Sequence, residues 1–476
     1  MLLSDQARDL VQRVTENNLW RQRECFNLIP SENTPSLLVK AMEISDPAGR
    51  YAEHRTMKGK EVYFYQGIDF IYDIEEECRK EICAYFDCPK AELRAISGQM
   101  ANEVVFKAVT NFLNRGRGEG ENWRRIGSVM NNDLTKGGHL SSQPMGALFN
   151  YVNRGDDDKE NVTNFPIDKD NLYKIDTKAL PSMLEEAQPE LIIFGKSMFI
   201  YREPVKFVAD IVKNWEKRPI IMYDMAHVLG LYGAFQEPFA EGADIVTGST
   251  HKSYFGPQRG VIASSIEKKT RLSKLWLDIK SRVFPGSTSN HHLGTLLALL
   301  MATYEMNAFK TEYQKQVISN AKAFAKALNA AGLDVQGDEA DGFTETHQIL
   351  LRVSKYGPGD VIARRLEDNN IVCNYQALPD DESFLVSSGL RLGVPEMTRF
   401  GMKEDDFGTL AQLLADCVME DKPVKDEVAA YRKKFATMHF CLPKNEAVEL
   451  AAKVLSSAMP SSDYTELFVD NLSKLV

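Results

Sequence analysis

Three polar residues follow short apolar runs near the middle of the chain and could act together in catalysis. Asp224 follows the apolar run 220–223, His227 comes three residues later, and Lys252 follows the run 244–247. Such runs are typical of strands in a parallel sheet that is buried on both faces. Ligands bind beyond the carboxyl ends of these strands, so we expect the three side chains to face one site.

A lysine amine and a carboxylate at neighbouring strand ends suit pyridoxal phosphate. A buried lysine has a lowered pKa, so its amine can attack the cofactor aldehyde and form a Schiff base. The carboxylate keeps the pyridine nitrogen protonated, so the ring withdraws electrons. The stretch SGQMAN at 97–102 offers the Ser97 hydroxyl and a helix N-terminus to the phosphate.

Each of these residues also has an ordinary structural explanation. An aspartate after a strand is often a helix cap, and a His-Lys pair in a loop is often simply solvated. The combination of lysine, acid and phosphate-binding stretch is what favours the cofactor.

The elements that must position these residues alternate between strands and helices, which predicts an α/β fold with a mostly parallel sheet. The expected strands of this sheet are 191–194, 220–223, 244–247 and 261–264. A Gly-, Arg- and Asn-rich stretch over 114–133 predicts an exposed loop. A second α+β part is expected after a long helix over 293–332, with strands at 347–353, 370–374 and 389–394 and a helix at 403–419.

The chain of 476 residues exceeds what one hydrophobic core usually serves. We expect a helical N-terminal arm over 1–30, a large cofactor-binding domain over 31–300 and a small α+β domain with a helical tail over 301–476.

Composition excludes several classes of function. The formal net charge is −10, and the chain has no long basic block, which argues against nucleic acid as a partner. No apolar run approaches the ~20 residues that a bilayer requires, so no membrane partner is expected. The N-terminus turns polar at once and lacks a signal-peptide core, which predicts a cytoplasmic protein. The seven scattered cysteines predict reduced thiols, and no metal site is expected.

Several motifs in the same order resemble serine hydroxymethyltransferase and its relatives among the fold-type-I pyridoxal-phosphate enzymes. They are YDMAHVLG, STHK followed by GP, and GLRLGVPEMTRFGM at 389–402. The resemblance runs from NLIPSENTPS at 27–36 to GMKEDDF at 401–407. It implies a large domain with a seven-stranded, mostly parallel sheet and a smaller C-terminal α+β domain.

The resemblance assigns roles around the cofactor. It implies that Lys252 forms the Schiff base and that Asp224 pairs with the pyridine nitrogen. His227 would approach the ring hydroxyl, and His139, in GGHL, would stack on the ring and act in catalysis. The other residues that it places at the cofactor are Ser97, Gly98, Gln99, Ser197, His251 and Tyr51. His139, between two glycines and Leu140, also suits an ordinary turn.

The resemblance also implies how substrate is held. Arg391 would clamp the substrate carboxylate in a bidentate pair, and Ser31 would contact the same group. Glu53 would be the acid/base at the substrate hydroxyl, with Tyr65 beside it, and in the family Tyr51 and Glu53 reach in from the neighbouring subunit. A homodimer with shared active sites is therefore expected. Both residues also have ordinary explanations. Arg391 could form a surface ion pair, and Glu53 could be a solvated acid at a helix end.

Departures from the family pattern leave the acceptor open. Phe64 replaces the first of two tyrosines, Gln258 and Arg259 replace the usual order in GPRGG, and Gln376 replaces an asparagine that binds folate. The stretches GPQRG, FPGSTSNHH and DGFTETHQ are more similar to the folate-independent L-threonine transaldolases.

The expected function is cleavage or formation of the Cα–Cβ bond of a β-hydroxy-α-amino acid, between serine or threonine and glycine plus an aldehyde. Three acceptors of the transferred unit stay open: tetrahydrofolate, a second aldehyde or a proton. The departures from the family pattern make tetrahydrofolate doubtful. An aminotransferase or decarboxylase on the same fold is an alternative, although the YAE, GGHL and GLRLG motifs disfavour it. A non-catalytic relative is disfavoured because Lys252 is retained.

Overall fold

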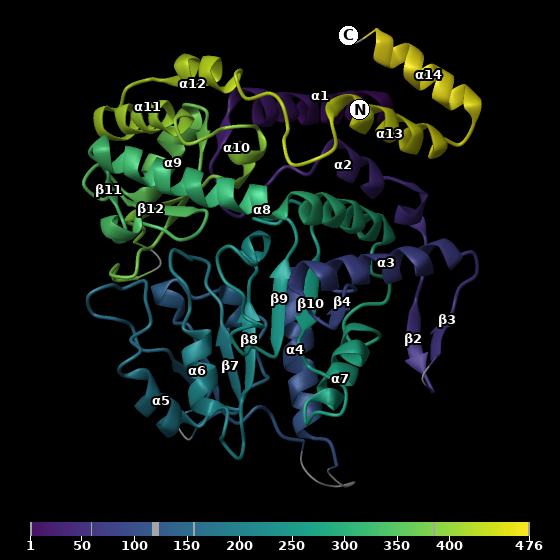
Figure 1. The fold of residues 1–476 in the computed structure, drawn as a ribbon. Helices are drawn as coiled ribbons and strands as arrows, with labels where there is room; N and C mark the ends of the chain where they lie inside the picture. Colours follow the sequence, from purple (N-terminus) through teal and green to yellow (C-terminus); the bar gives the residue numbers. More distant parts are fainter. Residues whose placement is uncertain (1, 59, 117–122, 156–157, 384–385, 475–476) are drawn as a thin grey trace.

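The computed structural model describes residues 2–58, 60–116, 123–155, 158–383 and 386–474. The described residues form a seven-stranded sheet, a four-stranded sheet and two pairs of short strands, with helices packed around them (Figure 1). Among these residues, no helix is both long and apolar enough to cross a membrane.

The larger sheet has seven strands in the order β4-β10-β9-β8-β7-β5-β6. Strands β9, β8, β7, β5 and β6 are parallel to one another, whereas β10 runs antiparallel to β9 and β4. This confirms the predicted α/β fold with a mostly parallel sheet. The strands are β4 (Lys90–Glu92), β5 (Val129–Asn131), β6 (Val162–Asn164), β7 (Leu191–Phe194), β8 (Ile220–Asp224), β9 (Ile245–Ser249) and β10 (Gly260–Ser264).

The predicted strands at 191–194, 220–223, 244–247 and 261–264 are confirmed within one or two residues as β7, β8, β9 and β10. All residues of these strands are buried. Helices cover both faces of the sheet, so continuous apolar runs replace the alternation of a half-exposed strand.

The prediction of an exposed loop over 114–133 is wrong at its end and in part falls outside the described residues. Val129, Met130 and Asn131 form β5, which is buried between β7 and β6. Three residues are too few to show a periodicity, and the polar stretch before them masks the strand.

Helices flank this sheet, and α4 packs closely against α7 (Figure 1). Both contribute to the buried cluster on one side of the strands. The helices of this part are α3 (Asp69–Phe86), α4 (Gly98–Leu113), α5 (Leu180–Ala187), α6 (Val205–Val212) and α7 (Ser273–Val283).

The long helix α8 (Leu293–Ala330) crosses from the first sheet to the second (Figure 1). The second sheet is antiparallel, in the order β11-β12-β15-β14. Its elements are β11 (Asp334–Val335), β12 (Gln348–Arg352), β14 (Asn374–Gln376) and β15 (Gly389–Gly393), with α9 (Gly359–Asp368), α10 (Pro395–Arg399) and α11 (Asp406–Glu420).

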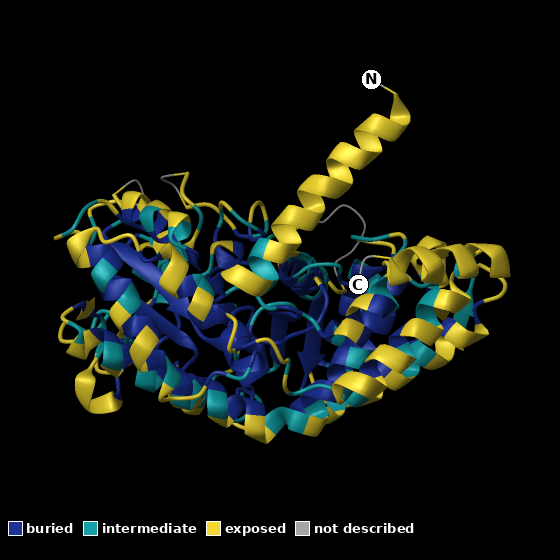
Figure 2. Cartoon of the chain, turned by 90° about the horizontal axis from the view of Figure 1, so that it is seen from above, coloured by how far each residue is buried: buried dark blue, intermediate teal, exposed yellow. Residues whose placement is uncertain are grey.

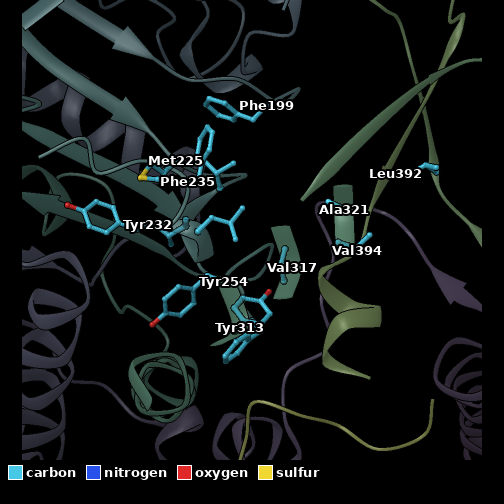
Figure 3. Close-up of a cluster of buried hydrophobic side chains, with 14 of the residues drawn as sticks. Phe199, Met225, Tyr232, Phe235, Tyr254, Tyr313, Val317, Ala321, Leu392 and Val394 are labelled. Carbon is cyan, nitrogen blue, oxygen red and sulfur yellow. The ribbon is translucent and has the colours of Figure 1, made fainter. Parts of the chain in front are cut away.

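One hydrophobic core joins the two sheets. Val317 and Ala321 of α8 lie between Met225, beyond β8, and Leu392 of β15 (Figure 3). This shared core holds the carboxyl ends of the large sheet against the smaller sheet.

Both ends of the chain lie on the side of the second sheet (Figure 1), but the view from above shows them well apart (Figure 2). Strand β1 (Phe26–Asn27) pairs with β13 (Ile371–Val372) in parallel. Helix α1 (Leu3–Leu19) has no buried residue and projects from the body (Figure 2). The remaining elements are α2 (Leu37–Glu43), the hairpin β2 (His54–Met57) and β3 (Lys60–Tyr63), α12 (Lys425–Arg432), α13 (Lys444–Ser457) and α14 (Ser462–Ser473).

Candidate active site

The carboxyl ends of β8 and β9 bring the predicted lysine, acid and histidine together. Strand β8 ends at Asp224, and the turn after β9 carries Lys252. Lys252 Nζ lies 3.4 Å from Nε2 of His227. These residues therefore lie where open α/β sheets bind ligands.

The Lys252 amine is in an environment that favours its neutral, nucleophilic form. Its pKa is lowered to about 8, chiefly by burial; the charge of Asp224 opposes this shift, and the positive charge of Arg391 adds to it. Burial and Lys252 together also hold the pKa of His227 well below its ordinary value, so His227 is neutral.

Asp224 is buried and carries several hydrogen bonds. Its Oδ2 lies 2.6 Å from Nδ1 of His139 and accepts a 2.7 Å bond from Nδ2 of Asn102, while Oδ1 accepts a 3.0 Å bond from the Ala226 N–H. Burial alone would raise the pKa of Asp224, but His139 and these bonds lower it below its ordinary value. The carboxylate is therefore ionised despite its burial.

The N-terminus of α4 opens beside the strand end of β9. The hydroxyl of Ser97 accepts a 3.1 Å hydrogen bond from the N–H of Met100 and caps the helix. A Cβ at Gly98 would lie 2.1 Å from Oγ of Ser249, so only glycine lets the helix approach this closely. Gln99 follows in the exposed first turn. Free N–H groups of a helix N-terminus bind phosphate well.

Arg391, on β15, reaches the large sheet from the second one. Its NH1 donates a 2.7 Å hydrogen bond to the carbonyl of Ser197, and its Nε donates a 3.2 Å bond to Oδ1 of Asn374. Burial lowers its pKa to about 10. Within the described parts of the chain no carboxylate forms an ion pair with Arg391, so this charge is available to a bound carboxylate.

A cavity of about 780 Å³ lies in front of Lys252. His251 lines this cavity, and its buried Nδ1 has no hydrogen-bond partner among the described residues. Burial and the charge of Lys252 lower the pKa of His251 to about 4. Among the lining residues are Ser31, Glu32, Asn33, His251, Lys252, Gln258 and Thr295. The cavity therefore contains the predicted Ser31 as well as the lysine.

The chain does not bring Tyr51, Glu53 and Tyr65 to this cavity. None of them lines it, and no contact among the described residues joins them to Lys252. The rings of Tyr51 and Tyr65 pack on each other with centroids 5.3 Å apart, and both side chains are exposed.

Two of the residues that depart from the family pattern have different surroundings. Gln258 is exposed at the cavity, whereas Arg259 is fully buried and turned away from it. Arg259 donates hydrogen bonds to the carbonyls of His291, His292 and Leu93. It thus supports the start of α8 and does not reach a ligand.

Three polar residues near the site were not identified from the sequence. Asn102 bonds Asp224, Asn374 bonds Arg391, and His347 is buried with its pKa lowered to about 3 by burial. Asn102 and His347 lie inside the stretches SGQMAN and DGFTETHQ. Helical spacing from Ser97 could have indicated Asn102, whereas Asn374 becomes visible only when β14 pairs with β15.

These residues fit pyridoxal phosphate. The site combines a lysine amine with a lowered pKa, a buried ionised carboxylate, an open helix N-terminus and two histidines, His227 and His251, whose buried Nδ1 atoms lack partners. Such a set binds an aldehyde, a pyridinium and a phosphate at once.

Comparison with known proteins supports this interpretation. The family model described as serine hydroxymethyltransferase matches residues 3–414. The serine hydroxymethyltransferase of Pyrobaculum arsenaticum is 35% identical over 460 residues, covering 96% of this chain and 99% of that protein. The serine hydroxymethyltransferase of Archaeoglobus fulgidus is 35% identical over 444 residues, covering 92% and 93% of the two chains.

A solved structure is also similar over nearly the whole chain. The L-threonine transaldolase from Pseudomonas fluorescens, in its internal aldimine state, superposes with a TM-score of 0.80 at 25% sequence identity. The match covers 96% of this chain and 98% of that one.

Proposed function

Since this chain belongs to the serine hydroxymethyltransferase family, we propose that it cleaves and forms the Cα–Cβ bond of serine or threonine with pyridoxal phosphate bound at Lys252. It is a pyridoxal-phosphate-dependent transferase with the fold-type-I architecture. The observation that carries the proposal is the buried Lys252 amine, 3.4 Å from His227, with the ionised Asp224 nearby.

Bound pyridoxal phosphate would supply two groups: an aldehyde that reacts with an amine, and a ring that accepts electrons from the substrate Cα. Lys252 would hold the aldehyde carbon of the cofactor. Asp224 holds a proton on the pyridine nitrogen, and His139 and Asn102 stabilise its charge. Ser97, at the N-terminus of α4, binds the phosphate.

The remaining cofactor contacts come from short segments around the ring. The ring centroids of His139 and His227 lie 5.2 Å apart. His227 would hold the ring hydroxyl of the cofactor, and His139 would hold its ring face. The residues that complete the cofactor site are Gly98, Gln99, Ser197, His251 and, from a second subunit, Tyr51.

Arg391 and Ser31 hold the substrate carboxylate. Arg391 is buried without a carboxylate partner among the described residues, and Ser31 lines the cavity in front of Lys252. Fixing the carboxylate on one side sets the Cα–Cβ bond perpendicular to the ring, a positioning effect on the rate.

Glu53 and Tyr65 act from a second copy of the chain. Glu53 takes the proton from the substrate hydroxyl, and Tyr65 orients that hydroxyl. The exposed, mutually packed Tyr51 and Tyr65 rings support this role, because they extend from the surface and not into their own cavity. The functional unit is a homodimer, and the protein works in the cytoplasm.

A second candidate is folate-independent transaldolase activity, in which an aldehyde accepts the glycine unit. It is favoured by the similarity to the solved L-threonine transaldolase and by Gln258, Phe64 and Gln376, which replace residues of the hydroxymethyltransferase pattern. The same Lys252 and Asp224 serve both reactions.

The deciding experiment measures serine cleavage, threonine cleavage and glycine α-proton exchange, each with and without tetrahydrofolate. Serine turnover that requires folate identifies a hydroxymethyltransferase. Acetaldehyde release from threonine that folate does not change identifies the aldolase or transaldolase branch. If none of the three substrates changes the cofactor absorbance near ~420 nm, the substrate assignment is wrong.

A further inference from the structure

A second group of buried ionisable side chains lies away from Lys252, where the hairpin β2–β3 meets α3 and the start of α8. His54 begins β2, Glu75 lies in α3, and His291 stands just before α8. Each is at most 2% exposed, and one ligand atom from each lies within 4.8 Å of the others. None of the steps proposed above uses these residues.

One oxygen of Glu75 faces both histidines. Its Oε2 lies 3.0 Å from Nε2 of His54 and 3.5 Å from Nε2 of His291. Arg79 donates a 2.9 Å bond to the other oxygen, Oε1. Nε2 of His291 is buried and has no hydrogen-bond partner. A buried polar atom without a partner carries a free-energy cost that a ligand can remove.

His54 is oriented by another carboxylate behind it. Its Nδ1 lies 3.1 Å from Oε2 of Glu61, and Glu61 in turn accepts a 2.6 Å bond from Nζ of Lys280. A carboxylate on the far ring nitrogen is the usual partner of a metal-binding histidine, because it fixes the tautomer with Nε2 free.

We propose that Nε2 of His54, Nε2 of His291 and Oε2 of Glu75 bind one divalent metal ion of the zinc class. Two imidazoles and a carboxylate are a ligand set that zinc favours, and the three leave a fourth position for water. Metal–ligand bonds of about 2.1 Å in tetrahedral geometry set ligand atoms about 3.4 Å apart. Both contacts of Oε2 are close to this separation, so only the two histidines must approach each other.

Positive groups around the cluster favour the metal-free form. Arg79 bonds Glu75, Arg94 donates to the carbonyl of His54, and NH2 of Arg259 lies 3.4 Å from Nδ1 of His291. In that form Arg259 donates to Nδ1, so Nε2 of His291 carries the ring proton. Metal binding moves this proton to Nδ1 and breaks the long contact between Nδ1 and Arg259. The negative charge of Glu61, behind His54, offsets part of the repulsion between the metal ion and the three arginines.

A metal here would tie three distant segments together beside the catalytic machinery. His54 directly follows Glu53, so the ion would hold the Tyr51–Glu53 segment and the hairpin against α3 and α8. His54, Glu75 and His291 are then positioning residues. The inference stands whether or not the proposed reaction is correct.

The test uses the untagged holoenzyme, treated with chelator, desalted, incubated with ZnCl₂ and desalted again. Zinc is then measured by elemental mass spectrometry in the wild type, His291→Gln and the matched control His292→Gln, whose exposed side chain is the sequence neighbour. We expect close to one zinc per chain in the wild type and in His292→Gln, and at least about tenfold weaker binding in His291→Gln. A wild type without zinc, or equal zinc in His291→Gln, overturns the proposal.

The absorption spectrum of cobalt-loaded protein addresses two complications of the zinc measurement. The seven cysteines could bind metal, and His291→Gln could fail to fold. Wild-type protein loaded with Co²⁺ should show visible d–d absorption without a near-ultraviolet thiolate band. A thiolate band, or no d–d absorption, shows that these histidines hold no metal.

Discussion

Nδ1 of His139 lies 2.6 Å from Oδ2 of Asp224, so the two residues form a buried pair at the end of β8. Asn102 donates to the same oxygen, and Thr247 donates a 2.6 Å bond to Asn102. This chain of bonds keeps Asp224 negative in a buried position, where an unpaired carboxylate would take up a proton. The charge of Asp224 in turn acts on Lys252.

The pH dependence of cofactor binding should follow the Lys252 amine. Only the neutral amine attacks an aldehyde, so the rate at which apoenzyme incorporates pyridoxal phosphate should rise with pH, with a midpoint near the lowered pKa of about 8. Asp224 raises this pKa and Arg391 lowers it. Asp224→Asn should therefore move the midpoint down, and Arg391→Gln should move it up, each by about half a pH unit. Stopped-flow absorbance near ~420 nm measures both, and midpoints moving in the same direction would contradict the electrostatic account.

Borohydride reduction should attach the cofactor to Lys252 and to no other lysine at these strand ends. The competitor is Lys196, which follows β7, but its Nζ is buried 2.6 Å from Oε1 of Glu203 and is held as a charged pair. A charged amine is not a nucleophile. Peptide mapping by mass spectrometry gives the answer, and label on Lys196 would refute the assignment of Lys252.

Replacing Arg391 by lysine should weaken substrate binding. Lysine keeps the positive charge but loses the planar pair of donors, so KM for the amino acid should rise by about tenfold or more. Arg352 on the neighbouring strand β12 pairs with Asp380 at the surface and is the matched control. Arg352→Lys should change KM by less than about twofold. Similar KM values for the two variants would place the substrate carboxylate elsewhere.

Two inactive variants should restore each other if active sites are shared between subunits. Lys252→Ala lacks the cofactor amine, and Glu53→Gln lacks the proposed acid/base. Unfolded together, mixed equally and refolded, they form heterodimers in which one site has both residues intact. About a quarter of wild-type activity should return. Activity that stays at the level of the separate variants would show that each chain supplies its own Glu53.

Arg259 should contribute to stability and not to ligand binding. Arg259→Met leaves buried carbonyls of His291 and Leu93 without a donor, which should lower the free energy of unfolding by about 3 kcal/mol. Gln258→Ala, at the exposed neighbour, should change it by less than about 0.5 kcal/mol. Urea denaturation followed by tryptophan fluorescence measures both. An unchanged urea midpoint in Arg259→Met would show that water replaces the guanidinium.

Strand and helix prediction succeeded where the signal is local. The runs LIIF at β7 and IIMY at β8 are continuous and apolar, and α8 shows a long helical pattern. It failed at β5, where three buried residues follow a polar stretch. The pairing of β1 with β13 was also not predicted, because two strands of two residues each, far apart along the chain, leave no local signal in the sequence.

The residues of the candidate site also fall into those that the sequence predicts and those that only the tertiary structure reveals. Lys252, Asp224 and His227 could be proposed together from the sequence, because parallel strands bring their carboxyl ends to one edge of a sheet. Asn374, by contrast, contacts Arg391 only through the register between β14 and β15. Arg259 departs from the order of the family motif GPRGG, and only the tertiary structure shows that it is buried against the start of α8.

The sequence by itself therefore determined the fold class and led to the proposal of Lys252 as the cofactor lysine with Asp224 as its acid, since residue type and position after a strand are local properties. Only the tertiary structure decided that Tyr51 and Tyr65 pack at the surface away from Lys252, and that His54, Glu75 and His291 meet in one buried cluster. These contacts join segments distant along the chain, and their geometry depends on how whole helices and strands pack.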